Sequence, residues 1–500
     1  MLLRGGRVAR PGKDEPEMLD IRITDGRFSE LRPGIRPVAD EAVCDLGGLL
    51  VLPGGIDSHV HFDTPGFTER EDFLHGGAEA ARGGITTVID MPCTSLPPVT
   101  SVANLEHKLE AIRPLALIDY GLYGGLAGPV SGEPEQADPE YLEKTIGALS
   151  PYVLGFKAYL LSGMDTFPRL NHEALGRAIR GCAAAGRPLL LHAEDADYVY
   201  AATERIQKQI RAGAPKGGAE HIGGAEKNDP ATWDDYVDSR PEAAELVAVA
   251  AAVQLSGKNG GTLHIVHVGT AAAAALAHEA RATCETCTHY LAFTREDFAA
   301  KGSSLKTAPP VKEAHNRDKL WQYLQDGTID FVTSDHAPAR YEEKRTGSVW
   351  TDYGGIPGVG TTYPYLISEG YLKGRLSLAR LQDLMAASKA RRFGLADRKG
   401  SIEAGLDADF VVVDPAGQSV IRGEGLYSKG KDTPFHGMEL WGSLVGTWLR
   451  GQAVYLNPAM KRFWERFINM NYENGPYEDL PGIMVSGGYG RWLRWGGTSA

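Results

Sequence analysis

The chain has 500 residues, of which 43% are hydrophobic and 8% aromatic, so it is long enough to bury the core of a large globular fold. Its formal net charge of −12 at pH 7 argues against a nucleic-acid partner, which needs a basic face. No stretch approaches the roughly 18 apolar residues of a membrane span, and the 5 cysteines are too scattered for a disulfide framework, so we expect a cytoplasmic protein with no membrane partner.

The two ends of the chain carry the signals of β-strands. Residues 20–28 alternate apolar and polar side chains and contain Asp25-Gly26, a pair typical of a hairpin turn. Near the other end, residues 407–414 and 444–455 are again strand-like, with Arg450-Gly451 at a turn. Neither piece is large enough to bury a core alone. We therefore predict that residues 1–52 and 401–457 meet in one composite β-sandwich.

Between residues 53 and 400, short apolar runs that end in polar residues alternate with helical stretches near 175–185, 241–255 and 376–387. Strands that alternate with helices imply a parallel sheet buried on both faces. With at least seven such units, a (β/α)8 barrel is favoured over an open sheet. The first expected barrel strand ends in His59-Val60-His61, and the later ones are 84–90, 153–157, 188–192, 263–267, 282–287 and 329–335.

Two segments depart from this alternation. Residues 211–240 are rich in Gly, Lys, Asn and Pro, so we interpret them as a long loop beside the barrel mouth and a candidate lid. Residues 458–500 form a C-terminal tail with several aromatic residues, which makes the tail a candidate subunit interface.

The first candidate site lies in residues 53–62, which read PGGIDSHVHF. His59 and His61 are separated by one residue, and on an extended segment this spacing places both imidazoles on one face. Two neutral imidazoles side by side suit zinc or a similar metal. For this stretch alone, two polar histidines in a loop are an equally good interpretation.

Later predicted strands also end in residues that can ligate a metal. The carboxyl ends of barrel strands meet at one face, so these side chains should gather near the first two histidines. A carboxylate at such a strand end can ligate a metal and also accept a proton from water. For Asp335, a helix N-cap is the competing interpretation. The strand before Asp335 and Pro338 after it favour a functional loop. The residues are Lys157, His192, His267 and Asp335.

Lys157 differs from the other candidates, because it is a basic residue whose neighbours Leu154, Phe156 and Leu160 predict a buried strand end. A buried ammonium is costly unless it is paired, and a protonated lysine cannot ligate a cation. Addition of CO2 to the amine would give a carbamate, an anion whose two oxygens can bridge two metals. A lysine that reaches the surface is the alternative, but the surrounding histidines and aspartate favour the carbamate.

Other candidates carry less weight. His264 lies three residues before His267 and is interpreted as a core residue, and His289 as a residue behind the ligands. Cys284 and Cys287 form a single CxxC with no second pair, so we interpret them as strand residues. No P-loop, GxSxG or HExxH motif supports the corresponding nucleotide-binding or hydrolase classes.

These residues together resemble the amidohydrolase superfamily, in its cyclic-amidase branch of allantoinases, hydantoinases (dihydropyrimidinases) and dihydroorotases. The resemblance covers residues 1 to about 455 and implies hydrolysis of a small-molecule cyclic amide by two zinc ions. By this resemblance, His59, His61 and Asp335 hold the more buried zinc, and His192 and His267 the more exposed one. Lys157, as N6-carboxylysine, bridges both, and Asp335 is also the general base.

Within this branch, the local motifs are closest to those of allantoinases. Dihydroorotases typically carry an arginine two residues after the second histidine and favour asparagine in the Met-Pro motif, where this chain has Asp63 and Cys93. Hydantoinases place a tyrosine five residues after the lysine, where this chain has Ser162, with Tyr159 close by. Ala308 replaces a common serine. The matching motifs are MPCTSLPP (91–98), DYVDSRP (235–241), VHV (266–268), TCETCTHY (283–290) and GGIPG (354–358).

The resemblance therefore implies an allantoinase-like enzyme that converts allantoin and water to allantoate. Hydantoinase or dihydropyrimidinase activity, and then dihydroorotase activity, are the alternatives. Substrate contacts are expected from Tyr159, Ser162, Ala308 and Tyr353. A non-catalytic dihydropyrimidinase-like scaffold is an alternative of another class, but such proteins have typically lost metal ligands that this chain retains. A homotetramer or homodimer is the family expectation.

Overall fold

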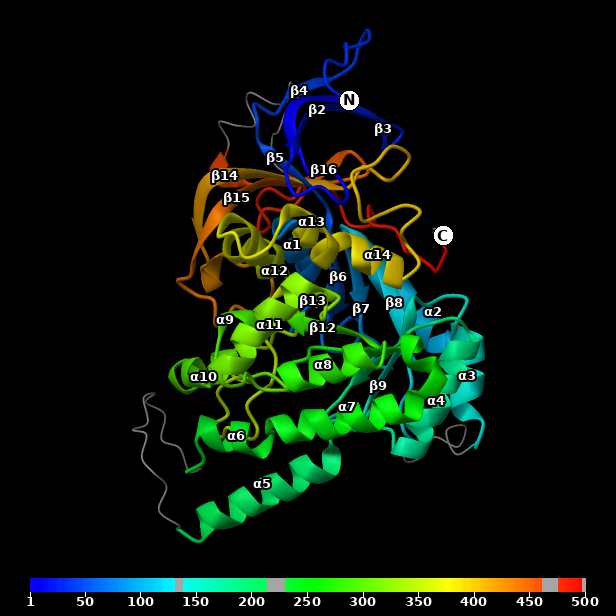
Figure 1. Ribbon diagram of the computed structural model, residues 1–500, viewed down its shortest axis with the longest axis vertical. Helices are drawn as coiled ribbons and strands as arrows, with labels where there is room; N and C mark the ends of the chain where they lie inside the picture. The colour runs from blue at the N-terminus through cyan, green and yellow to red at the C-terminus, as the bar shows by residue number, and fades with distance from the viewer. Residues whose placement is uncertain (131–137, 214–229, 461–474, 497–500) are drawn as a thin grey trace.

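The computed structural model describes residues 1–130, 138–213, 230–460 and 475–496, which form two eight-stranded sheets. Figure 1 shows the blue strands of the N-terminal segment beside the orange β14 and β15 at one end of the molecule, with the barrel strands below them. The first sheet consists of β1 (Leu2–Val8), β2 (Glu17–Thr24), β3 (Arg27–Arg32), β4 (Val43–Asp45), β5 (Leu50–Pro53), β14 (Phe410–Val420), β15 (Glu439–Leu449) and β16 (Gln452–Leu456).

The two ends of the chain meet in this first sheet, as the sequence predicts. β5 pairs antiparallel with β14, with Leu50 opposite Val413, and the strand order is β16-β15-β14-β5-β1-β2-β3 with β4 on β1. Apolar side chains from both ends, including Ile21, Phe410 and Trp448, pack in one buried cluster. Neither end could bury these side chains without the other.

Both predicted hairpin turns are confirmed. Asp25 and Gly26 have φ angles of 50° and 75°, and Arg450 and Gly451 have φ angles of 50° and 74°. Each pair connects two antiparallel strands, β2 to β3 and β15 to β16. Two consecutive residues with positive φ are what a type I′ turn requires, which explains the glycine at the second position.

The second sheet is a parallel (β/α)8 barrel, which confirms the predicted fold class. Its order is β13-β12-β11-β10-β9-β8-β7-β6, and the barrel closes through a parallel bridge between Val60 and His336. The His61 backbone N–H donates to the His336 carbonyl at 2.8 Å across this seam. The strands are β6 (Gly55–Val60), β7 (Ile85–Asp90), β8 (Asp119–Gly125), β9 (Gly155–Tyr159), β10 (Leu189–His192), β11 (Leu263–Ile265), β12 (Thr283–Cys287) and β13 (Phe331–Thr333).

Helices surround the barrel strands, and α4, α7 and α8 lie along one side of it in Figure 1. The π-helical segments Leu366–Leu372 and Asp383–Ala387 continue α12 and α13. The helices are α1 (Phe73–Arg82), α2 (Val102–Ile112), α3 (Tyr141–Leu149), α4 (His172–Ala184), α5 (Ala196–Arg211), α6 (Trp233–Ser239), α7 (Glu242–Ser256), α8 (Ala271–Glu279), α9 (Thr288–Ala292), α10 (Arg295–Lys301), α11 (Ala314–Asp326), α12 (Val359–Tyr365), α13 (Leu378–Gln382) and α14 (Ser388–Arg392). None of the described helices is both long enough and apolar enough to cross a membrane.

Strand β8 is the barrel strand that sequence reasoning missed, because three glycines weaken its pattern. The packing requires these glycines. A Cβ on Gly121 would lie 2.2 Å from a Leu154 methyl, and one on Gly124 would lie 2.7 Å from the Phe156 ring. Neighbouring side chains therefore occupy the space that a larger residue in β8 would need.

The structure describes only parts of the 211–240 segment and of the C-terminal tail. The long loop predicted for residues 211–240 is wrong at its C-terminal end, where α6 is a helix with a capping box between Thr232 and Asp235. Residues 214–229 lie outside the described residues. In the tail, Trp492 forms a β-bridge with Tyr120 and stacks on Tyr152 of the same chain, with ring centroids 6.4 Å apart. Trp495 is also described, with the Arg187 guanidinium carbon 4.6 Å from its ring centroid, whereas the tail aromatics at 464, 467 and 472 lie outside the described residues.

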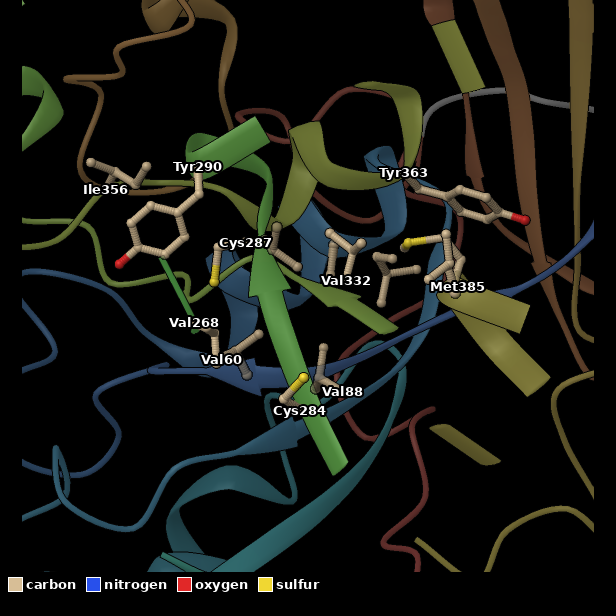
Figure 2. Close-up of a cluster of buried hydrophobic side chains, with 14 of the residues drawn as sticks. Val60, Val88, Val268, Cys284, Cys287, Tyr290, Val332, Ile356, Tyr363 and Met385 are labelled. Carbon is tan, nitrogen blue, oxygen red and sulfur yellow. The ribbon is translucent and has the colours of Figure 1, made fainter. Parts of the chain in front are cut away.

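The barrel core contains the CxxC pair. Figure 2 shows Cys284 and Cys287 on β12 among apolar side chains that include Val60, Val88 and Val332. Both cysteines are free and buried. Both lie on β12, which confirms the prediction that they are strand residues.

Candidate active site

All six predicted ligand-type residues lie at the carboxyl ends of barrel strands. His59 is on β6 with His61 just after it, Lys157 is on β9, and His192 ends β10. His267 and Asp335 each lie two residues beyond a strand, β11 and β13. These last two have φ angles of 39° and 49°, in the left-handed region. Non-glycine residues held there carry backbone strain, which is common at functional sites.

The first group consists of His59, His61 and Asp335. The Nε2 atoms of His59 and His61 lie 3.1 Å and 3.5 Å from the same oxygen, Oδ1 of Asp335. One ligand atom from each residue lies within 4.8 Å of the other two, a spacing that can hold a metal ion. Two imidazole nitrogens and a carboxylate are a donor set that zinc accepts.

The second group consists of His192 and His267, which lie beside the first. His192 Nδ1 is 2.9 Å from His267 Nε2, and the His267 ring centroid is 5.4 Å from that of His59. The opposite nitrogen of the His267 ring, Nδ1, is buried and has no hydrogen-bond partner among the described residues. The structure therefore brings four imidazoles together from β6, β10 and β11, as the sequence predicts.

Lys157 is buried at the same strand ends, and no acidic side chain among the described residues forms an ion pair with its amine. Its side chain has an exposed fraction of 0%, and its Nζ finds no hydrogen-bond partner among the described residues. Nζ lies 4.9 Å from the centroid of the Tyr159 ring. Burial lowers the pKa of this amine to about 8. A buried amine without a counter-ion is the feature that the carbamate interpretation of the sequence requires.

Two glutamates that sequence reasoning missed orient the histidines. Glu285 on β12 lies 2.6 Å from His59 Nδ1 and 3.2 Å from His264 Nε2. Glu194 lies 3.0 Å from His192 Nε2 and accepts from Arg240. Carboxylates in these positions select the tautomer and fix the ring. Glu285 lies inside the TCETCTHY motif and Glu194 two residues after His192, but only the fold shows that Glu285 contacts His59.

A cavity of about 400 Å³ opens above these residues. All four predicted substrate contacts, Tyr159, Ser162, Ala308 and Tyr353, lie in its wall. The Ser162 hydroxyl is already engaged, because it donates to the Phe167 carbonyl at 2.7 Å. Tyr159 places its hydroxyl 3.1 Å from the Cys93 sulfur. Cations and aromatic residues that the sequence did not single out complete the wall, namely Arg70, Arg240, Lys306, Tyr236 and Trp350.

A second acidic group, Asp119, Asp407 and Asp409, also has ligand atoms within 4.8 Å of one another. Here the charge is already balanced. Lys399 Nζ lies 2.8 Å from Asp119 and 2.5 Å from Asp409, and Arg450 pairs with Asp119. Asp119 begins β8, at the end of the barrel opposite the cavity. We interpret this group as an ion-pair network that joins the barrel to the terminal sheet.

Lys344 supports the wall of the cavity and gives a prediction about pH. It is 1% exposed and donates to the carbonyls of Gly355 and Tyr353, at 2.6 Å and 3.3 Å. Burial lowers its pKa from 10.5 to about 7. Between these values the unfolded chain binds a proton that the folded chain does not, so folding becomes more favourable as pH rises.

We therefore expect the unfolding free energy of the wild type to rise, relative to Lys344→Met, between pH 7 and pH 10. The gain should approach about 1.4 kcal/mol per pH unit at most. Chemical denaturation at several pH values measures it. Lys373→Met, at an exposed lysine paired with Glu369, is the control and should show a constant difference. A constant difference for Lys344→Met as well would contradict the prediction.

The chain is similar to known amidohydrolases in both its sequence and its fold. A model of the Amidohydrolase family matches residues 50–454. The allantoinase of Rubrobacter xylanophilus is 37% identical over 461 residues, covering 91% of this chain and 94% of that protein. The allantoinase of Deinococcus radiodurans is 34% identical, with coverage of 91% and 95%. Among solved structures, the L-hydantoinase (dihydropyrimidinase) of Arthrobacter aurescens superposes with a TM-score of 0.83 at 28% identity, over 98% of both chains.

Proposed function

The chain belongs to the amidohydrolase family, and from this premise we propose that it hydrolyses a ring amide bond of allantoin to give allantoate. It is an allantoinase-like cyclic amidohydrolase, similar over 91% of its length to allantoinases. The observation that carries the proposal is the convergence of four imidazoles and a carboxylate in the wall of one cavity, with the buried amine of Lys157 on β9 at the same strand ends. The similarity to allantoinases supports the choice of ring.

We further propose that the site holds two zinc ions. His59, His61 and Asp335 would bind one, His192 and His267 the other, and Lys157, as N6-carboxylysine, both. The buried Nζ of Lys157 has no hydrogen-bond partner in the part of the chain that the structure describes, and carboxylation would turn this amine into an anion with two oxygen ligands. The facing nitrogens of His192 and His267, 2.9 Å apart, are the donors that zinc prefers. Zinc, when bound, would polarise the ring carbonyl and make water a nucleophile at neutral pH.

The chain's own residues would move the proton. Asp335 would accept a proton from the attacking water as the water oxygen bonds to the carbonyl carbon. It would return that proton to the ring nitrogen as the C–N bond breaks, which leaves an open ureide and a carboxylic acid that releases its remaining proton to solvent to become a carboxylate. Glu285 would hold the Nδ1 proton of His59 and so leave the Nε2 lone pair free for the metal ion that His59 would share with Asp335. Tyr159, Ser162, Ala308 and Tyr353 would form the walls around the ring.

A substrate panel tests the function. Purified enzyme, assayed with allantoin, hydantoin, dihydrouracil and dihydroorotate, should give its highest kcat/KM with allantoin. The same preparation should contain close to two zinc ions per chain and lose activity on treatment with a chelator. Activity that is confined to dihydroorotate, or that survives complete metal removal, would contradict the proposal.

The alternatives make different predictions for the same panel. Structural similarity to an L-hydantoinase favours hydantoinase or dihydropyrimidinase activity as the second candidate, which would place hydantoins or dihydrouracil first. A non-catalytic scaffold would open no ring and bind no stoichiometric metal, and the retained ligand-type residues argue against it. The expected homotetramer or homodimer stays a prediction that light scattering can test.

Glu194 should control metal affinity without touching the substrate. Its carboxylate lies 3.0 Å from His192 Nε2 and is held by Arg240, so Glu194→Gln should leave His192 in the wrong tautomer for part of the time. We expect zinc affinity to fall about 10- to 100-fold. Competition with a chromogenic chelator measures this. Glu204→Gln, at an exposed glutamate on α5, is the matched control, and equal affinities for the two variants would refute the role.

A further inference from the structure

Arg70 is held in one orientation at the wall of the cavity. Its guanidinium carbon lies 4.7 Å from the Phe67 ring centroid and 4.8 Å from that of Tyr353. Its Nε and Nη2 atoms each lie 2.8 Å from Oε1 of Glu343. Two rings and a carboxylate thus fix a group that would otherwise be flexible, so a ligand that bonds to it loses little additional entropy.

The part of Arg70 that remains for a ligand is its Nη1 amino group. No residue in the described part of the chain accepts a hydrogen bond from Nη1, whereas Nε and Nη2 are committed to Glu343. Arg70 lines the same cavity as His59, and Glu343 does not. A pre-oriented donor in a cavity wall discriminates strongly between ligands that offer an acceptor and ligands that do not.

Arg70 is also separate from the reacting groups. It forms no hydrogen bond, ion pair or ring contact with any of the six ligand-type residues among the described contacts. The scissile amide must lie at the ligand-type residues, so a group bonded by Arg70 belongs to another part of the substrate. Within the ring-opening reaction proposed above, that part is the substituent on the ring.

The charges around Arg70 favour a neutral acceptor. Arg70 is paired with Glu343, and Arg240, the other arginine of the wall, is paired with Glu194. Both guanidinium charges are therefore already balanced, so neither arginine is left to neutralise an anionic substituent, and Lys306 in the same wall donates to the carbonyls of Trp350 and Asp352. A carbonyl oxygen needs only the N–H donor.

We propose that Arg70 determines substrate specificity by donating from Nη1 to the carbonyl oxygen of a neutral ring substituent, such as the ureido group of allantoin. The inference rests on the proposed function and adds to it the group of the substrate that Arg70 recognises. It predicts a preference for ureido-substituted rings over the same ring without a substituent.

Three substrates and three variants test the inference. Hydantoin is the unsubstituted ring, allantoin carries a ureido group, and hydantoin-5-acetic acid carries a carboxylate. Arg70→Gln should raise KM for allantoin roughly tenfold, with kcat nearly unchanged, and should leave both constants for hydantoin within about twofold. Arg340→Gln is the matched control, because Arg340 also pairs with Glu343 but is 51% exposed and lies outside the cavity wall. Arg340→Gln should leave KM and kcat for both allantoin and hydantoin unchanged.

Arg70→Lys keeps the charge but loses the planar fork, so it should also raise KM for allantoin, and its melting temperature reports on folding. Equal losses on hydantoin and allantoin in both Arg70 variants would overturn the inference, as would no change on either. A wild-type preference for the carboxylate that Arg70→Gln abolishes would overturn the neutral acceptor. Wild-type inactivity on all three rings overturns the proposed function and the inference together, whereas an allantoin-active enzyme indifferent to Arg70 overturns the inference alone.

Discussion

Replacement of Lys157 by alanine is expected to lower kcat/KM for ring opening by at least about a thousandfold and to reduce bound metal below one ion per chain. Without its side chain, neither group of histidines has the shared anionic ligand that the proposed pair of zinc ions requires. Lys157 is fully buried and its Nζ has no hydrogen-bond partner among the described residues, so keeping it costs stability, as expected of a functional residue.

The matched variants separate function from folding. Lys157→Met fills a similar volume without a charge, so it should be at least as stable to heat as the metal-free wild type while remaining inactive. Lys144→Ala, at a lysine whose side chain is 61% exposed, should change neither activity nor metal content. Steady-state kinetics, elemental analysis and thermal unfolding on the three variants provide the measurement. Full activity with full metal in Lys157→Ala would refute the proposed centre.

Replacement of Asp335 by asparagine is expected to lower kcat by about a thousandfold or more. Proton transfer by a positioned group contributes about 10²- to 10⁴-fold, and an amide oxygen can still approach a metal but cannot carry the proton. The Asp335 carboxylate lies within 3.5 Å of Nε2 of both His59 and His61, so no other described carboxylate occupies an equivalent place. Metal content distinguishes the two roles. Lost activity with metal retained indicates the base, and lost metal indicates the ligand.

Asp352→Asn is the control for this prediction. Asp352 also lines the cavity, but its Oδ1 accepts from the Thr346 backbone N–H and hydroxyl, both at 2.8 Å. Its carboxylate is therefore committed to the loop, and we expect a change in kcat of less than about fivefold. An active Asp335→Asn enzyme, or comparable losses in both variants, would contradict the assignment of Asp335.

Much of the proposed centre followed from strand periodicity and from the geometry of the barrel. A spacing of two residues places His59 and His61 on one face of an extended segment, whatever the rest of the chain does. Parallel strands in a barrel bring their carboxyl ends to one rim, so Lys157, His192, His267 and Asp335 could be assigned to that rim from chain order alone. The hairpin turns at Asp25-Gly26 and Arg450-Gly451 followed from local conformational preference in the same way.

The tertiary structure alone decided the features that depend on contacts between distant segments. Glu285 is 226 residues from His59, and Arg70 is 273 residues from Glu343, so no local pattern could reveal either pair. Strand β8 was missed because its glycines are required by the space that Leu154 and Phe156 occupy beside them. They produce no periodic pattern in the sequence of β8 itself. Periodic and turn signals are local properties of the backbone and can be read along the chain. Partners across a closed barrel are set by packing, which exists only after the chain has folded.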